Sequence, residues 1–151
     1  MAKFRYRMQN ILNVKEKLET QAKNEFATAR LRLDEEEEKL NALYARKDDY
    51  LDRGRRARNS AININELTEN TYALERMDEY IADQKLEVKK AERELEKATD
   101  RLTEAMKETK IHTRLKEKAF EEFKKELNSE EAKEIDELTS YRYGQRKDGN
   151  V

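Results

Sequence analysis

The 151-residue chain has no cysteine, no proline and no tryptophan, and only three glycines. The lack of cysteine removes disulfides, zinc–thiolate sites and thiol catalysis together. The glycines, at positions 54, 144 and 149, are too scattered to form a phosphate-binding loop. No segment approaches the roughly 20 apolar residues of a membrane span, and no apolar run follows the basic N-terminus as in a signal peptide. We therefore expect a soluble, cytosolic protein.

Apolar residues are also scarce, at 36 % of the chain against 44 % charged residues. So few cannot fill a thick globular core, whereas a coiled coil needs a core only one or two side chains wide. Disorder is the competing interpretation of such a charged chain. The net charge of −1, from 33 basic and 34 acidic residues, argues against general nucleic-acid binding.

What the chain does have is a seven-residue repeat, which disordered segments do not keep. From residue 67 to 112, the a and d positions of successive heptads form one narrow, mainly apolar seam. This seam predicts a long helix that needs a partner along its length. The a positions hold Leu67, Leu74, Ile81, Val88, Leu95, Leu102 and Thr109, and the d positions hold Asn70, Met77, Gln84, Ala91, Ala98, Ala105 and His112.

An earlier helix, from about residue 4 to 57, is predicted by apolar residues at steps of three and four. Two successive steps of four, at Leu18, Ala22 and Phe26, predict a stutter in its coiled-coil repeat. A second stutter is predicted after the seam, where residues at steps of four continue it: Ile111, Leu115, Ala119, Phe123 and Leu127.

A turn between the two helices is predicted because the apolar period fails over residues 52–60. Asn63 and Glu66 have the spacing of a capping box, so the later helix is expected to run from about residue 64 to 141. The predicted fold is all-α: a long antiparallel two-helix coiled-coil hairpin. Residues 1–143 form its single domain, and residues 144–151 form a disordered tail. Folding near residue 60 would pair residues whose numbers sum to about 121.

Catalysis is not expected from this architecture. His112 is the only histidine and has no metal-spaced partners, so we interpret it as structural. Carboxylates on two paired helices point into water, and no dry pocket is available. The sequence therefore predicts no enzyme, no metal and no cofactor. The one basic cluster, Arg53 to Arg58, contacts phosphates or an acidic protein, or else favours a helix C-terminus.

Tyrosines gather near the predicted turn and suggest two interpretations. They lie along a thin core with their hydroxyls in water, or they form a docking patch. Two adjacent stripes compete for one seam, Leu43 with Tyr50 and Tyr44 with Leu51, while Tyr72 and Tyr80 flank the later seam. The opposite end carries more apolar surface than two helices need, and it is a second candidate interface: Phe4, Tyr6, Met8, Ile11, Leu12, Leu115, Phe120 and Phe123.

The opening Phe4-Arg5-Tyr6-Arg7-Met8-Gln9-Asn10-Ile11-Leu12 resembles the start of FliJ proteins, small coiled-coil components of the flagellar type III export apparatus. Similar segments follow at residues 72–81 and 134–142, so the resemblance covers essentially the whole chain. It implies a two-helix coiled coil like the γ stalk of rotary ATPases. Ala73 departs from the family, where an aromatic residue often stands.

The resemblance implies three kinds of partner. The end with both termini enters the ring of the export ATPase (FliI), the turn-proximal part reaches the export gate protein FlhA, and export chaperones are escorted. The implied gate contacts are Leu43, Tyr44, Tyr50, Tyr72, Met77, Tyr80 and Gln84. The implied ATPase-ring contacts are Met8, Ile11, Leu12, Leu115 and Phe123.

Our leading hypothesis is a monomeric, non-enzymatic coupling component in the cytoplasm, at the inner face of the membrane through its partners only, with no nucleic acid bound. The alternative is a generic coiled-coil adaptor or homodimer, in which the seam pairs between chains. A stalk subunit of a rotary ATPase would need a globular insertion, for which the chain has no room.

Overall fold

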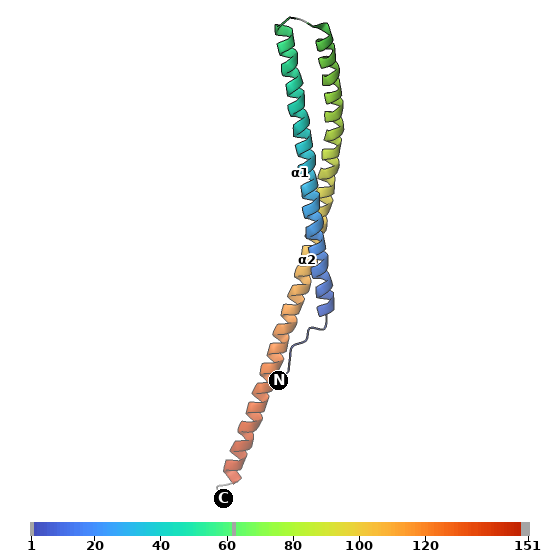
Figure 1. Ribbon diagram of the computed structural model, residues 1–151. Helices are drawn as coiled ribbons and strands as arrows, with labels where there is room; N and C mark the ends of the chain where they lie inside the picture. Colours follow the sequence, from blue (N-terminus) through green and yellow to red (C-terminus); the bar gives the residue numbers. More distant parts are fainter. Residues whose placement is uncertain (1, 62, 149–151) are drawn as a thin grey trace. The chain divides into compact units, whose positions relative to one another are not determined.

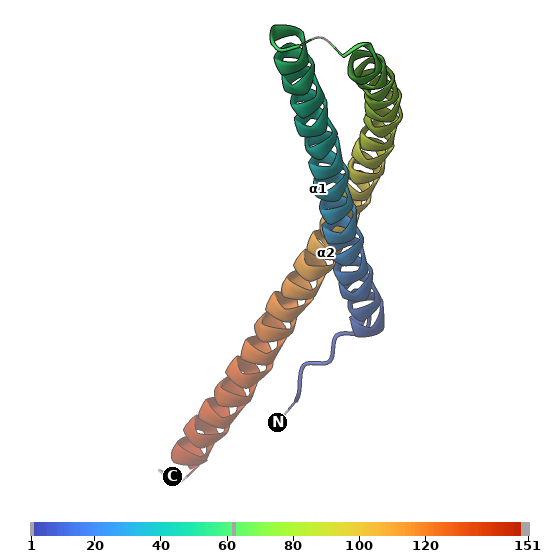
Figure 2. The ribbon, with the colours of Figure 1, turned by 45° about the horizontal axis from the view of Figure 1, so that its top comes forward.

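The computed structural model describes residues 2–61 and 63–148, and this part of the chain consists of two long α-helices without strands. Helix α1 spans Gln9–Asn59 and helix α2 spans Ile64–Asp148. The two helices pack against each other in antiparallel directions (Figure 1; Figure 2). The predicted all-α hairpin is therefore confirmed. Over the described residues, neither helix has an apolar stretch that a bilayer crossing would require.

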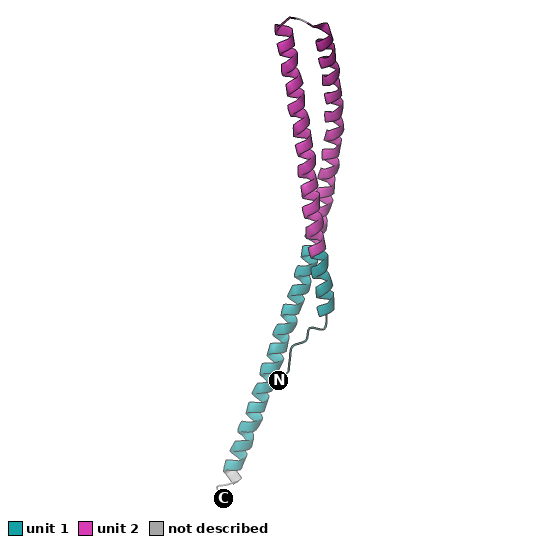
Figure 3. Cartoon of the chain, viewed as in Figure 1, with its two compact units in different colours: residues 1–19, 105–151 teal, residues 20–104 magenta. Residues whose placement is uncertain are grey.

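The chain divides into two compact units, coloured separately in Figure 3. Unit 2 comprises Thr20–Glu104 and contains the turn with the paired segments on either side of it. Unit 1 combines the chain up to Glu19 with the chain from Ala105 onward. In unit 1 the first turns of α1 pack on α2, while side chains 128–146 of α2 are all exposed.

Helix α1 begins at Gln9 rather than near residue 4, because the preceding segment suits a helix N-terminus poorly. Lys3, Arg5 and Arg7 would place positive charge against the positive end of the helix dipole. The segment instead makes a turn, in which the Gln9 amide donates to the Tyr6 carbonyl at 3.2 Å. Leaving the helix allows the Phe4 ring to pack on α2.

The boundaries around the turn follow local chemistry. The Asn63 side chain accepts a hydrogen bond from the Asn65 amide at 3.1 Å, so the Asn63 half of the predicted capping box and the start of α2 are confirmed. Helix α1 continues past Gly54 to Asn59, with Arg56 and Arg58 in its last turn. Cationic side chains there oppose the negative end of the helix dipole, which is the structural interpretation of the arginine cluster.

Helix α2 ends later than expected, at Asp148 instead of about residue 141. Residues 144–148, expected in a disordered tail, continue the helix, and residues 149–151 lie outside the described residues. Arg142 and Arg146 lie in its final turns, where positive charge stabilises a helix C-terminus.

The predicted seam of α2 is confirmed, since all fourteen of its positions from Leu67 to His112 are buried or half-buried. On α1 the observed repeat is an unbroken heptad, so the predicted stutter was wrong: Leu18 is exposed and Glu19 takes the seam position. The stripe comprises Leu12, Lys15, Glu19, Ala22, Phe26, Ala29, Leu33, Glu36, Leu40, Leu43, Lys47, Tyr50, Gly54 and Ala57.

The second predicted stutter is confirmed only in its later part, where Ala119, Phe123 and Leu127 are half-buried at two successive steps of four. Ile111 and Leu115 are exposed, and His112 and Lys116 continue the heptad instead. In both helices, the phase is set by the long facing repeat rather than by the most apolar local residue, because every heptad must meet its partner.

The centre of the core lies in unit 2. Leu33, Val88 and Ala91 are buried together, with Leu40 and Leu95 packed against them. Ala91 is completely buried, consistent with small residues allowing the helices to approach closely. The ion pairs of Lys15 with Glu108, Arg32 with Glu94, and Lys47 with Asp78 have residue-number sums of 123 to 126 rather than about 121. The turn is therefore centred slightly later than predicted.

Candidate docking surfaces

Gln84, an implied gate contact, is half-buried and bonded across the seam. Its amide nitrogen donates to the Glu36 carbonyl at 2.9 Å and to the Glu36 carboxylate at 2.5 Å. The hydrogen bond from Gln84 lowers the pKa of Glu36, because it stabilises the ionised carboxylate. A polar pair in a coiled-coil core fixes register. In the isolated chain, Gln84 therefore positions α1 against α2.

Two lysines at seam positions of α1 are also paired across it. Lys47 lies 2.8 Å from the Asp78 carboxylate, and the resulting hydrogen bond raises the pKa of Lys47. Lys15 lies 3.4 Å from Glu108, and its carbonyl accepts a hydrogen bond from the Thr109 hydroxyl at 3.2 Å. These polar seam positions thus add to the specification of register.

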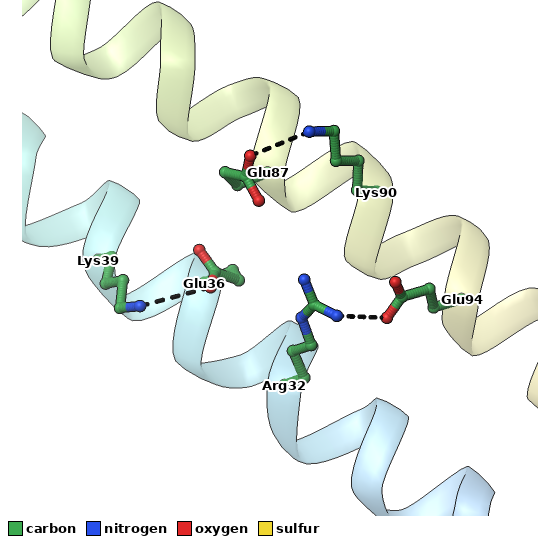
Figure 4. A network of polar contacts seen from close by, with 6 residues as sticks. All are labelled: Arg32, Glu36, Lys39, Glu87, Lys90 and Glu94. Carbon is green, nitrogen blue, oxygen red and sulfur yellow. Dashed lines mark hydrogen bonds and ion pairs between the residues drawn. The ribbon is translucent and has the colours of Figure 1, made fainter.

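Charged residues in and beside the seam form a further network, shown in Figure 4. Arg32 of α1 reaches across to Glu94 of α2 at 2.7 Å, while Lys39–Glu36 and Lys90–Glu87 pair within their own helices. Such exposed pairs each contribute little to stability.

The structure decides between the two aromatic stripes near the turn. Leu43 and Tyr50 occupy the seam and are half-buried, whereas Tyr44 and Leu51 remain exposed on the adjacent stripe. Lys85 of α2 lies 5.9 Å from the Tyr44 ring, in a cation–π contact. Tyr44 is thus accessible and lies on the same edge of the seam as Lys85.

Tyr80 lies on the other edge. Tyr80 stands two heptads before Glu94, so both side chains occupy the same heptad position of α2. Because Glu94 pairs with Arg32 across one edge of the seam, Tyr80 lies on that edge. Tyr44 and Tyr80 therefore lie on opposite edges, and the expected tyrosine patch is split between two faces. Tyr72 is 64 % exposed and Met77 only 3 %. The Met77 side chain packs in the core, while Tyr72 is free to contact a partner.

A groove of about 660 Å³ lies on unit 2 beside the turn. It is lined by Arg53 and Arg56 from α1 and by Glu66 and Glu69 from α2, together with Tyr50 and Ala73. Sequence reasoning missed this groove. The signal was present as small residues near the turn, namely Gly54 and Ala57 in the seam and Ala73 beside it.

The implied ATPase-ring residues separate into core and surface. Leu12 is 3 % exposed and lies in the seam, and Phe123 is half-buried. The Phe4 ring packs on Phe120 and Phe123, with centroids 5.1 and 5.5 Å away. Met8, Ile11 and Leu115 are exposed. Three further exposed apolar residues were not predicted as contacts here: Val14, Leu18 and Ile111.

His112 is largely buried at a seam position of unit 1. Its Nε2 lies 3.9 Å from Glu108, and its Nδ1 has no hydrogen-bond partner among the described residues. Over the same part of the chain, no group of three or more His, Cys, Asp and Glu side chains is arranged to hold a metal ion.

The described residues thus form an antiparallel two-helix coiled coil with exposed apolar side chains in both units. The family model described as "Flagellar FliJ protein" matches residues 4–148. The chain therefore belongs to the FliJ family of flagellar proteins.

A solved structure is similar in fold. It is CT670 from Chlamydia trachomatis, described as a YscO homolog, with a TM-score of 0.73 and 24 % sequence identity. The similarity covers 96 % of this chain and 98 % of CT670. A search of curated protein sequences found no match.

Proposed function

We propose that the protein is a non-enzymatic component of the flagellar export apparatus that links the export ATPase (FliI) to the gate protein FlhA. It works in the cytoplasm at the inner face of the membrane, which it reaches through these partners, and it escorts export chaperones. The observation that carries the proposal is the FliJ family match over residues 4–148. Exposed apolar and aromatic residues in both units support two separate docking surfaces.

The proposed ATPase-ring contact uses unit 1. Met8, Ile11 and Leu115 supply accessible apolar contacts, while Leu12 and Phe123 hold the helices that present them. We expect Met8→Ser with Leu115→Ser to weaken assembly of the ATPase hexamer, measured by sedimentation and ATP turnover. Leu86→Ser, which alters an exposed apolar residue of unit 2, is the control. Equal assembly with both variants would contradict this contact.

The proposed gate contact uses unit 2, through Tyr80 on one edge and Tyr44 on the other, with Leu43 and Tyr50 in the seam between them and Tyr72 nearby. Met77 and Gln84 support these side chains from the seam. Tyr50→Ala with Tyr80→Ala should retain helical circular dichroism and lower binding to purified gate protein. A loss of helicity would assign the tyrosines to the core instead.

The proposal as a whole is tested with the intact chain. Binding to the ATPase and to the gate protein, and reduced motility in a deletion strain, are the expected results. Normal motility together with no binding to either partner would refute it.

A further inference from the structure

Unit 1 carries a continuous strip of exposed apolar side chains from both helices. They are Ile11, Val14, Leu18, Ile111 and Leu115, between 41 % and 54 % exposed; we call them the apolar face. Large exposed apolar patches mark interaction sites on soluble proteins. The strip is the strongest feature that the core of the hairpin does not use.

The two halves of the apolar face lie on one edge of the seam. Ile11 lies four residues before Lys15, and Leu18 lies three residues after it. These three side chains therefore share one strip of α1. Leu115 is seven residues after Glu108, on one strip of α2. Because Lys15 pairs with Glu108 at 3.4 Å, the two strips adjoin.

The exposed residues of the apolar face stand next to polar residues that occupy the seam. Leu18 is exposed beside the seam residue Glu19, and Ile111 is exposed beside the seam residue His112. Leu115 likewise stands beside Lys116. The two-helix hairpin leaves the apolar members of these pairs in water, because the facing repeat fixes its phase. Apolar residues one strip outside a polar seam are placed where a third helix would cover them.

Charge indicates what kind of helix this is. Residues 2–19 and 105–119 contain ten basic and four acidic residues, whereas the whole chain is nearly neutral. Exposed Lys17, Arg114 and Lys118 flank the apolar face. A second copy of this basic region would be repelled, and a nucleic acid would leave the apolar side chains uncovered.

We propose that the apolar face binds one amphipathic helix of a partner protein, with acidic residues flanking its apolar stripe, and so completes a three-helix bundle. The proposal rests on the proposed function in one respect, since it describes the same end of the chain as the ATPase contact. The new inference specifies which kind of partner segment binds, namely an amphipathic helix with acidic flanks. The proposed ATPase contact does not specify this segment.

The test uses the full chain and a labelled synthetic helix of about three heptads, with Leu on its apolar stripe and Glu on its flanks. Fluorescence anisotropy should show saturable binding that weakens at about 0.5 M salt. The same peptide with Lys in place of Glu should bind at least about tenfold more weakly. Equal binding of the two peptides, or none, would overturn the proposal.

Variants locate the site. Ile11→Ser with Leu115→Ser should weaken acidic-peptide binding about tenfold or more, whereas Leu31→Ser with Leu86→Ser, which alters exposed apolar residues of unit 2, should not. Lys17→Glu with Lys118→Glu, on exposed positions that do not enter the seam, should also weaken it. Two results would refute the proposal: an RNA oligonucleotide that binds more tightly than the acidic peptide, or self-association of the chain that these variants abolish. Peptide binding without ATPase binding would refute only the ring contact.

Discussion

Single polar residues in the seam, rather than its apolar ones, distinguish this hairpin from a generic coiled coil. Gln84 bonds both the carbonyl and the carboxylate of Glu36, and Lys47 pairs with Asp78. Apolar heptads alone tolerate a shift of one whole repeat, whereas these bonds are satisfied in one register only.

The Glu36–Gln84 bond predicts a specific response to acid. The folded-state pKa of Glu36 is lowered, so its contribution to stability is present above the unfolded pKa and is lost as pH falls through the folded value. In Gln84→Met, the fall in melting temperature between about pH 5 and pH 3 should be smaller than in the parent protein.

Carbon NMR of the Glu36 carboxyl measures the pKa of this group directly. The pKa should rise in Gln84→Met, because the hydrogen bond that lowers it is lost. Glu37→Gln, at the exposed neighbouring position, is the control and should leave the downward shift of the Glu36 pKa in place. An unaltered Glu36 titration in Gln84→Met would show that the bond does not form in solution.

At the scale of the helices, the phase of the heptad decides which of two adjacent apolar residues is core. Leu12 is 3 % exposed and Ile11 is 41 % exposed. Leu12→Ala should therefore lower stability by at least about 2 kcal/mol, because it removes a buried side chain. Ile11→Ala should cost less than about 1 kcal/mol.

Thermal and urea unfolding followed by circular dichroism compare these variants. The pair is matched in position and nearly in size, so it isolates burial from helix propensity. If the two substitutions destabilised the chain equally, the observed phase of α1 would be incorrect.

Gly54 sets the helix spacing near the turn. A Cβ added there would lie 2.5 Å from the Asn70 side-chain nitrogen, which is the end of a flexible side chain. Gly54→Ala should therefore be tolerated and raise stability by up to about 1 kcal/mol through helix propensity. Gly54→Leu should instead lower it by about 1–3 kcal/mol, since the extra volume must separate the helices.

Gly144→Ala is the matched control for this pair, because nothing lies within 4 Å of an added Cβ there. It reports the propensity gain alone in urea unfolding. A Gly54→Leu protein as stable as the parent would mean that the helices do not approach closely at this point.

At the scale of the whole molecule, the chain supplies its own partner. Because α1 occupies the seam of α2, we expect a monomer at micromolar concentrations, in contrast to the homodimer alternative. Sedimentation equilibrium should give the mass of one chain. A dimer that persists on dilution would favour pairing of the seam between chains.

Much of the fold was predictable from the sequence. The heptads from Leu67 to His112 specified a long helix and its buried face, and Asn63 specified where that helix begins. These signals are local or periodic, so they need no knowledge of the partner. The candidate docking residues, near the turn and near the start of α1, were also predictable as groups. The signal was the excess of apolar and aromatic side chains in these two regions.

What only the tertiary structure decided was which side chains of that group face water. Leu12 and Ile11, or Tyr50 and Tyr44, are neighbours of similar character in the sequence, and only the phase imposed by the opposite helix separates them. The same phase placed Tyr44 and Tyr80 on opposite edges and left Leu18 exposed beside Glu19. The sequence by itself determined that this protein is a two-helix hairpin; the packing of one helix on the other determined which of its residues are available to partners.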